Sequence, residues 1–146
     1  MIRTTLFATV ALAVLSCAAG AGVPATKPEP VRKIAVNVDP LAAAKLSGQP
    51  GVTVVSDEER MKESFGEAIA KQIVGKVDFA KEDLVYVSWG SSGPPFGDLR
   101  FEAKDGKILT FFVKEPKAAI RGQAYRLGND FFAVPKNAKV KFGGTR

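Results

Sequence analysis

The second half of the chain is a succession of short apolar stretches separated by turn residues, and this pattern restricts the fold more than any other feature. Residues 84–89 are almost continuously apolar, as in a central strand buried on both faces. Residues 99–103 alternate apolar with charged side chains, and Asp105-Gly106 then gives the strongest hairpin signal of the sequence. Further strands are predicted at 31–38, 52–55, 108–113, 122–127, 131–134 and 139–142.

One amphipathic helix is predicted between the early strands and this β-rich half, over about 57–74. Ser56 with Glu59 three residues on forms a capping box, and apolar residues then recur on one face. Gly66 weakens the middle of the helix by about 1 kcal/mol relative to alanine. Gly75 is a natural C-terminal stop.

Together these elements predict an α+β fold dominated by antiparallel sheet. About seven short strands form a β-sandwich or a partly open barrel, with the helix packed at one side. Gly128-Asn129-Asp130 and Pro135-Lys136-Asn137 are expected to be turns. In an up-and-down strand order, loops 90–98 and 114–121 and turn 135–138 then leave the same end of the sheet.

The N-terminal segment is typical of an export signal, because Arg3 precedes a short apolar run that is too short to span a bilayer. The sequence offers two alternative cleavage positions for this signal. Either residues 1–21 are removed and a soluble protein begins near Gly22, or residues 1–16 are removed and Cys17 becomes the lipidated N-terminus of a lipoprotein. Residues 22–30 are expected to form a flexible linker, and residues 31–146 a single globular domain. The expected location is the periplasm, the cell surface or the extracellular space, with membrane attachment only by the lipid anchor.

The side-chain inventory excludes several kinds of catalytic site. The chain has no histidine and one cysteine, so it holds no Ser-His-Asp triad and no imidazole metal site, and it has no free thiol in its body. We therefore predict no enzyme activity, no cofactor and no metal site.

Positive charge gathers near the C-terminus, within a formal net charge of +6. Lys139 and Lys141 alternate with Val140 and Phe142, as on the solvated face of a half-buried strand. Such a face could also hold an acidic surface polymer, which makes an envelope structural protein the alternative function. Nucleic acid is not an expected partner, because no stacking aromatic motif accompanies the charge.

The glycine- and proline-rich segment 90–98 is the candidate binding loop. Its prolines lower the entropy cost of presenting Phe96 to a partner, while an equally good interpretation has Phe96 fold back to cap the sheet. Lys117, Arg121 and Lys136 are expected at the same end, and scaffolded loops gathered at one end commonly form a binding surface. The predicted partner-binding residues are Ser91, Ser92, Pro94, Pro95, Phe96, Asp98, Lys117, Arg121 and Lys136.

The order of features over residues 52–142 resembles the PrcB-type domain of exported bacterial proteins, named for a partner of a surface protease complex. The resemblance rests on the stretches 53–59, 77–87 with Trp89-Gly90, 122–125 and 132–142. The family's loop usually closes with a Gly-Gly-Tyr-like element, whereas this chain has Phe96-Gly97-Asp98. The resemblance implies a non-catalytic protein-binding module that binds, stabilises or inhibits a secreted or surface protease.

Overall fold

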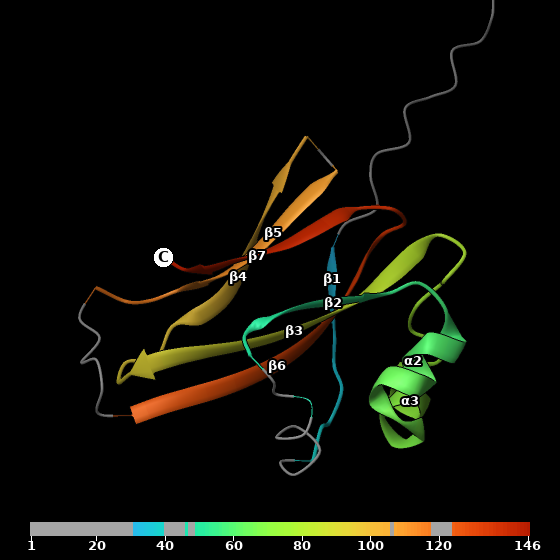
Figure 1. Ribbon diagram of the computed structural model, residues 1–146, viewed down its shortest axis with the longest axis horizontal. Helices are drawn as coiled ribbons and strands as arrows, with labels where there is room; N and C mark the ends of the chain where they lie inside the picture. Colours follow the sequence, from blue (N-terminus) through green and yellow to red (C-terminus); the bar gives the residue numbers. More distant parts are fainter. Residues whose placement is uncertain (1–30, 40–45, 47–48, 106, 118–123) are drawn as a thin grey trace, which may run out of the picture.

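The computed structural model of the chain describes residues 31–39, 46, 49–105, 107–117 and 124–146 (Figure 1). Within these residues the fold is α+β, with two helices and seven strands in two sheets. The strand pairs are mostly antiparallel and the sheets do not close into a barrel, so the predicted fold class is confirmed. The expected signal segment, the lipidation candidate Cys17, the linker 22–30 and Arg121 lie outside the described residues.

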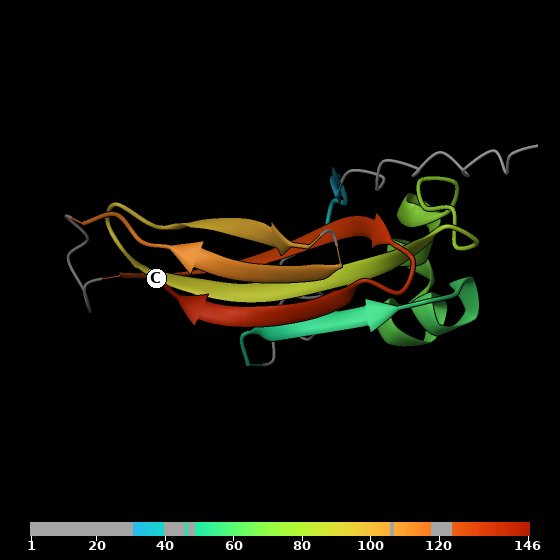
Figure 2. The ribbon, with the colours of Figure 1, turned by 90° about the horizontal axis from the view of Figure 1, so that it is seen from above.

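The two sheets share the seven strands unequally. The larger sheet has the order β1 (Arg32–Ile34), β6 (Ala124–Pro135), β3 (Glu82–Gly93) and β2 (Gly51–Val55). The smaller sheet has the order β4 (Asp98–Lys104), β5 (Ile108–Lys114) and β7 (Lys139–Thr145). Only the β5–β7 pair is parallel. Seen from above, the strands run along an elongated molecule and the helices gather near one end (Figure 2).

β3 divides the protein interior into two cores. Its Leu84 and Tyr86 side chains join the core between the larger sheet and the helices. Val85, Val87 and Trp89 point to the opposite face and join the core between the two sheets. Because successive residues of a strand face opposite sides, an almost continuous apolar run supplies both cores. The predicted central, doubly buried strand is therefore confirmed.

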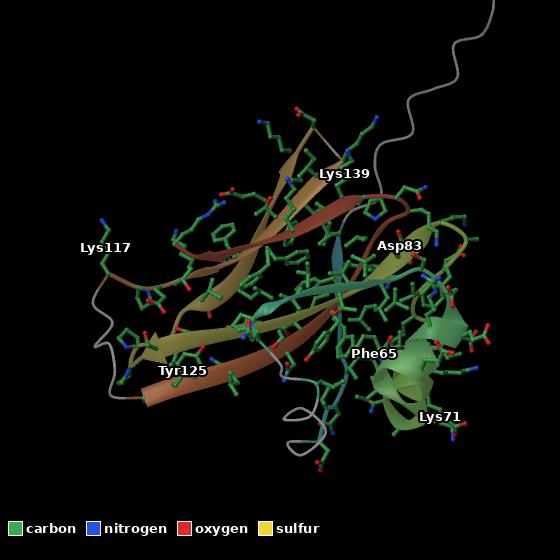
Figure 3. The ribbon with its side chains drawn as sticks, in the orientation of Figure 1. Phe65, Lys71, Asp83, Lys117, Tyr125 and Lys139 are labelled. Carbon is green, nitrogen blue, oxygen red and sulfur yellow. The ribbon has the colours of Figure 1, made fainter. Side chains whose placement is uncertain are left out.

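The long β3–β6 pair defines the two ends of the molecule. Gly93 pairs with Ala124 at the end that carries residues 94–97 and 115–117, which we call the loop end. Glu82 pairs with Pro135 at the other end, near α2 (Glu58–Phe65) and α3 (Glu67–Ile73), which we call the helix end. Figure 3 shows Tyr125 and Lys117 at the loop end, and Asp83 and Lys71 at the helix end.

The expected turn at 128–130 is wrong, because β6 continues through it as one strand of twelve residues. The turn-favouring residues there serve side-chain contacts. The Asn129 side chain accepts a hydrogen bond from the Tyr86 hydroxyl (2.6 Å), and Asp130 accepts one from the Trp89 indole (2.8 Å). Losing one chain reversal moves the next turn to the opposite end of the sheet. Turn 135–138 therefore lies at the helix end, and the expected grouping of Lys136 with the binding loop is wrong.

β3 also extends further than the sequence predicts, and it runs to Gly93 in register with β6. The loop that the sequence places at 90–98 is therefore reduced to residues 94–97, between β3 and β4. Its first two peptide bonds, Gly93–Pro94 and Pro94–Pro95, are cis.

The single predicted helix is two helices, which meet at Gly66. This residue has φ 77° and ψ 164°, a conformation that is essentially restricted to glycine, and it caps the end of α2 and the start of α3. The break lets Met61 and Phe65 of α2 and Ile69 and Ile73 of α3 all reach the same core. The N-cap is Asp57, not Ser56, since the Asp57 carboxylate accepts the Arg60 backbone N–H at 2.8 Å.

The first strand is shorter than predicted, because the chain leaves the sheet after Ile34. Val36 and Val38 pack instead against the helix core. The Asn37 backbone N–H and carbonyl both bond the Gln72 side chain, at 2.7 and 3.0 Å. β1 therefore pairs only with residues 131–133 of β6.

Candidate functional site

Hydrogen bonds of two serines of the predicted site, Ser91 and Ser92, hold the loop end together. Ser91 is 1% exposed, and its hydroxyl oxygen accepts the Gly97 backbone N–H at 2.6 Å. The Ser92 backbone N–H donates to the Glu115 carboxylate at 3.3 Å, and the Ser92 hydroxyl lies 3.4 Å from the same oxygen. These bonds tie β3 to the segments before β4 and after β5. Ser91 is therefore a scaffold for the loop, and only Ser92 is partly exposed.

Phe96 folds back onto the sheet. Its side chain is half-buried, and its Cδ1 atom lies so near Gly93 that a Cβ at that glycine would come within 2.9 Å. Of the two interpretations offered by the sequence, this geometry favours the structural cap. Pro94 and Pro95 beside it are exposed.

The charged residues predicted for the site divide between the two ends. Asp98 and Lys117 are exposed at the loop end, and the Asp98 carboxylate lies 3.5 Å from the Arg100 guanidinium. Lys136 lies at the helix end, where its ammonium is 2.8 Å from the buried Asp83 carboxylate. It also donates to the backbone oxygens of Ser56 and Phe79, at 2.7 and 3.0 Å. Lys136 is therefore a structural residue.

Tyr125 and Leu127 are the most exposed large apolar side chains of the described chain, at 63% and 56%. They lie at alternate positions of β6, so both project from the same face of the larger sheet. The Tyr125 side chain reaches diagonally over Gly90 of β3, where an added Cβ would lie within 3.0 Å of two ring carbons and the hydroxyl oxygen. Glycine at position 90 thus lets Tyr125 lie against the sheet with much of its ring in solvent.

Arg126 lies between these two residues and projects from the opposite face. Its guanidinium carbon is 5.7 Å from the centre of the Trp89 ring, a cation–π contact. The Trp89 indole N–H donates to Asp130, whose other carboxylate oxygen is 2.5 Å from the Lys33 ammonium. Among the described residues Arg126 has no carboxylate within ion-pair distance.

A groove of about 360 Å³ lies between β4 and β6 on this face. Its charged lining consists of three cations and two carboxylates, namely Lys33, Arg100, Arg126, Asp98 and Asp130, and Trp89 lies among them. Since Lys33 pairs with Asp130 and Arg100 with Asp98, the unbalanced charge is that of Arg126.

These residues of β6 are not among the partner-binding residues that the sequence predicts. The sequence does contain a pattern that could have identified them. Tyr125, Arg126 and Leu127 alternate as in a strand that has an apolar face and a charged face. Their exposure could not be read from the alternation, because it depends on how far the helices and β1 extend along the sheet. Those elements cover only the helix end.

Nowhere in the described part of the chain do three or more acidic, cysteine or histidine residues gather as a metal site would need. Nor does it contain a helix with the length and apolar character to cross a bilayer. The fold and the site together define a small α+β domain of two packed sheets with an exposed aromatic and apolar patch. No family model matches the chain, and no curated protein or solved structure matches it.

Proposed function

We propose that the chain is an exported, non-catalytic module that binds another protein through its loop end. The observation that carries this proposal is the adjacent exposure of Tyr125 and Leu127 on β6. Tyrosine is enriched among the residues that dominate protein interfaces, and a long antiparallel pair holds both side chains in fixed positions. Pro94, Pro95 and Lys117 border the same end and would form the rim.

A secreted or surface protease is the partner that the resemblance to the PrcB-type domain favours. An exposed aromatic residue on a long antiparallel strand pair suits such a role, because little conformational entropy is lost when a side chain on a paired strand binds. The role is one of binding, stabilising or inhibiting the protease.

The test is capture of exported proteins by the full chain, expressed with its own N-terminal segment and then immobilised. We expect a captured protein to stay bound at raised ionic strength, since the contact is largely apolar. Replacing Tyr125 and Leu127 together by alanine should abolish capture, and Leu127→Ala alone should weaken it. Lys71→Ala, at the helix end, is the matched control. Capture that persists in the double variant would contradict the proposed site, and inhibition assays with the captured protein would test the protease role.

A second candidate function is supported by the outer face of the smaller sheet. Five lysines of this sheet and its hairpin turn are exposed and lack a carboxylate within ion-pair distance in the described part of the chain: Lys104, Lys107, Lys114, Lys139 and Lys141. The two arginines there are paired, Arg100 with Asp98 and Arg146 with Glu102. Such a basic face would hold an acidic envelope polymer, as the alternative function requires.

The salt dependence of binding distinguishes the two candidate functions, because contacts between charged groups weaken at raised ionic strength and apolar contacts do not. Retention on an acidic polysaccharide that is lost at moderate salt, and lost when Lys104, Lys139 and Lys141 are replaced by glutamine, would support the structural role. Retention that survives these three substitutions would exclude this face.

A further inference from the structure

Tyr125 and Leu127 border an edge of the larger sheet that has no partner strand in the described structure. We infer that the partner contributes an extended strand that adds to β6 along residues 124–130, with acidic side chains on the face toward Arg126. This inference rests on the proposed protein-binding function and specifies its mode, the addition of a strand to a sheet edge.

The edge is open along seven residues of the described structure. In the larger sheet β6 has β3 on one side, whereas β1 covers only residues 131–133 on the other. β1 cannot extend over the rest, since the chain after Ile34 is held by Gln72 and the helix core. Every second residue of such an edge directs its backbone N–H and C=O outward.

This edge also lacks three of the features by which proteins block strand addition, namely lysine, proline and bulges. It carries two charged side chains, those of Arg126 and Asp130. Residues 124–130 contain neither lysine nor proline, and β6 keeps an unbroken register with β3 over its twelve pairs. The edge strand β7 differs, because it carries Lys139 and Lys141 and its pairing with β5 shifts register.

The two faces of the edge define the chemistry of the added strand. On one face Tyr125 and Leu127 present apolar surface to its outward side chains. On the other face its side chains enter the groove between β4 and β6, where Arg126 is the unbalanced charge. Opposite charges on neighbouring strands are stabilising and like charges are destabilising. The fitting partner is therefore a segment in which apolar and acidic residues alternate.

The test uses two short synthetic peptides in which valine alternates with glutamate or, in the control peptide, with lysine. The full chain should bind the glutamate peptide more tightly, as measured by fluorescence anisotropy. Bound peptide should slow hydrogen exchange at alternate backbone amides of residues 124–130. Arg126→Glu should weaken binding of the glutamate peptide about tenfold, since attraction becomes repulsion, and should favour the lysine peptide. Leu127→Lys should weaken both peptides, because lysine blocks the edge.

Matched controls lie at the helix end. Lys71→Glu reverses an exposed charge, and Val74→Lys replaces an exposed apolar side chain. Neither should change the affinity for either peptide.

Several outcomes would overturn the inference. These are failure of both peptides to bind the folded chain, protection of amides elsewhere than residues 124–130, and an unchanged peptide preference in Arg126→Glu. A wild-type dimer in sedimentation that Leu127→Lys converts to monomer would assign the edge to a second copy of this chain. Capture of an exported protein without protection of the β6 amides would leave the proposed function standing and remove only strand addition. Binding of the glutamate peptide at the β6 amides without any captured protein would leave strand addition standing and remove the proposed protein-binding function.

Discussion

Trp89 lies directly opposite Gly128 in the β3–β6 pair, and its indole occupies the space that a side chain at position 128 would fill. On the other face of the same strand pair Tyr125 reaches diagonally over Gly90, and its side chain occupies the space that a Cβ at position 90 would fill. Each aromatic residue thus depends on a glycine of the neighbouring strand.

Replacing Gly128 by alanine should destabilise the fold. A Cβ there would come within 3.0 Å of three indole atoms, so Trp89 would have to move and strain its bond to Asp130. We expect a loss of about 1–3 kcal/mol in the free energy of unfolding, measured by urea denaturation. Gly51→Ala is the control, since its Cβ would meet only the Gln49 carbonyl at 3.8 Å. Equal stability of the two variants would contradict this account.

Gly66→Ala should also be destabilising, although alanine is the better helix former. Residues other than glycine rarely adopt the backbone conformation of Gly66, and for alanine it would cost about 1–3 kcal/mol. The expected result is a lower melting temperature with little change in helical circular dichroism. Ser64→Ala, at an exposed position of α2, should be neutral or slightly stabilising. A more stable Gly66→Ala protein would mean that one continuous helix fits the core.

Lys136→Ala should be among the more damaging substitutions of a charged residue. It would leave the Asp83 carboxylate, whose side chain is 6% exposed, without its cation and would release the Ser56 and Phe79 carbonyls. The expected loss is about 3 kcal/mol in the free energy of unfolding, measured by urea denaturation. Lys117→Ala, on the loop end, should change stability by less than about 0.5 kcal/mol. A mild effect of Lys136→Ala on stability, together with loss of partner capture, would contradict the structural role and show that Lys136 takes part in partner binding.

The carboxyl group of Asp78 provides a pH-dependent test near the start of β3. A hydrogen bond from Lys81 and one from the Ala80 backbone N–H lower the pKa of this carboxyl below its usual value. A carboxyl with a lowered folded-state pKa stabilises the fold above its unfolded pKa, and the contribution is lost as pH falls through the folded pKa. Lys81→Ala should raise the pKa of Asp78, as followed by carbon-detected NMR titration. An identical titration midpoint in the variant would contradict the assigned cause.

Local pattern predicted the elements of this fold better than their connections. The apolar run at 84–89 identified the central strand, because only a strand between two cores needs apolar residues on both faces. The turn predicted at Gly128-Asn129-Asp130 is wrong, since these residues are typical of a turn but here accommodate or bond aromatic side chains of β3. Side-chain partners on another strand cannot be read from a local window, and this one error displaced Lys136 to the wrong end of the molecule.

The residues of the candidate site were also hard to predict, because their exposure depends on contacts with distant parts of the chain. Phe96 was a reasonable choice from composition, yet glycine at position 93 gives its ring a place on the sheet. Tyr125 and Leu127 look like ordinary strand residues in the sequence. Their exposure follows from the short β1, and β1 is short because Asn37 and Val38 are drawn to the helices.

The pairing of Arg32 with Ala133 determines at which end of the domain an N-terminal membrane tether would attach. The chain preceding β1 joins the fold near the C-terminal end of β6, whereas Tyr125 lies near the N-terminal end of that strand. A twelve-residue strand is roughly 40 Å long. In a protein held by a lipid on Cys17, the tether would therefore attach at the helix end, and residues 124–130 of β6 would lie at the opposite end of the domain from the point of attachment.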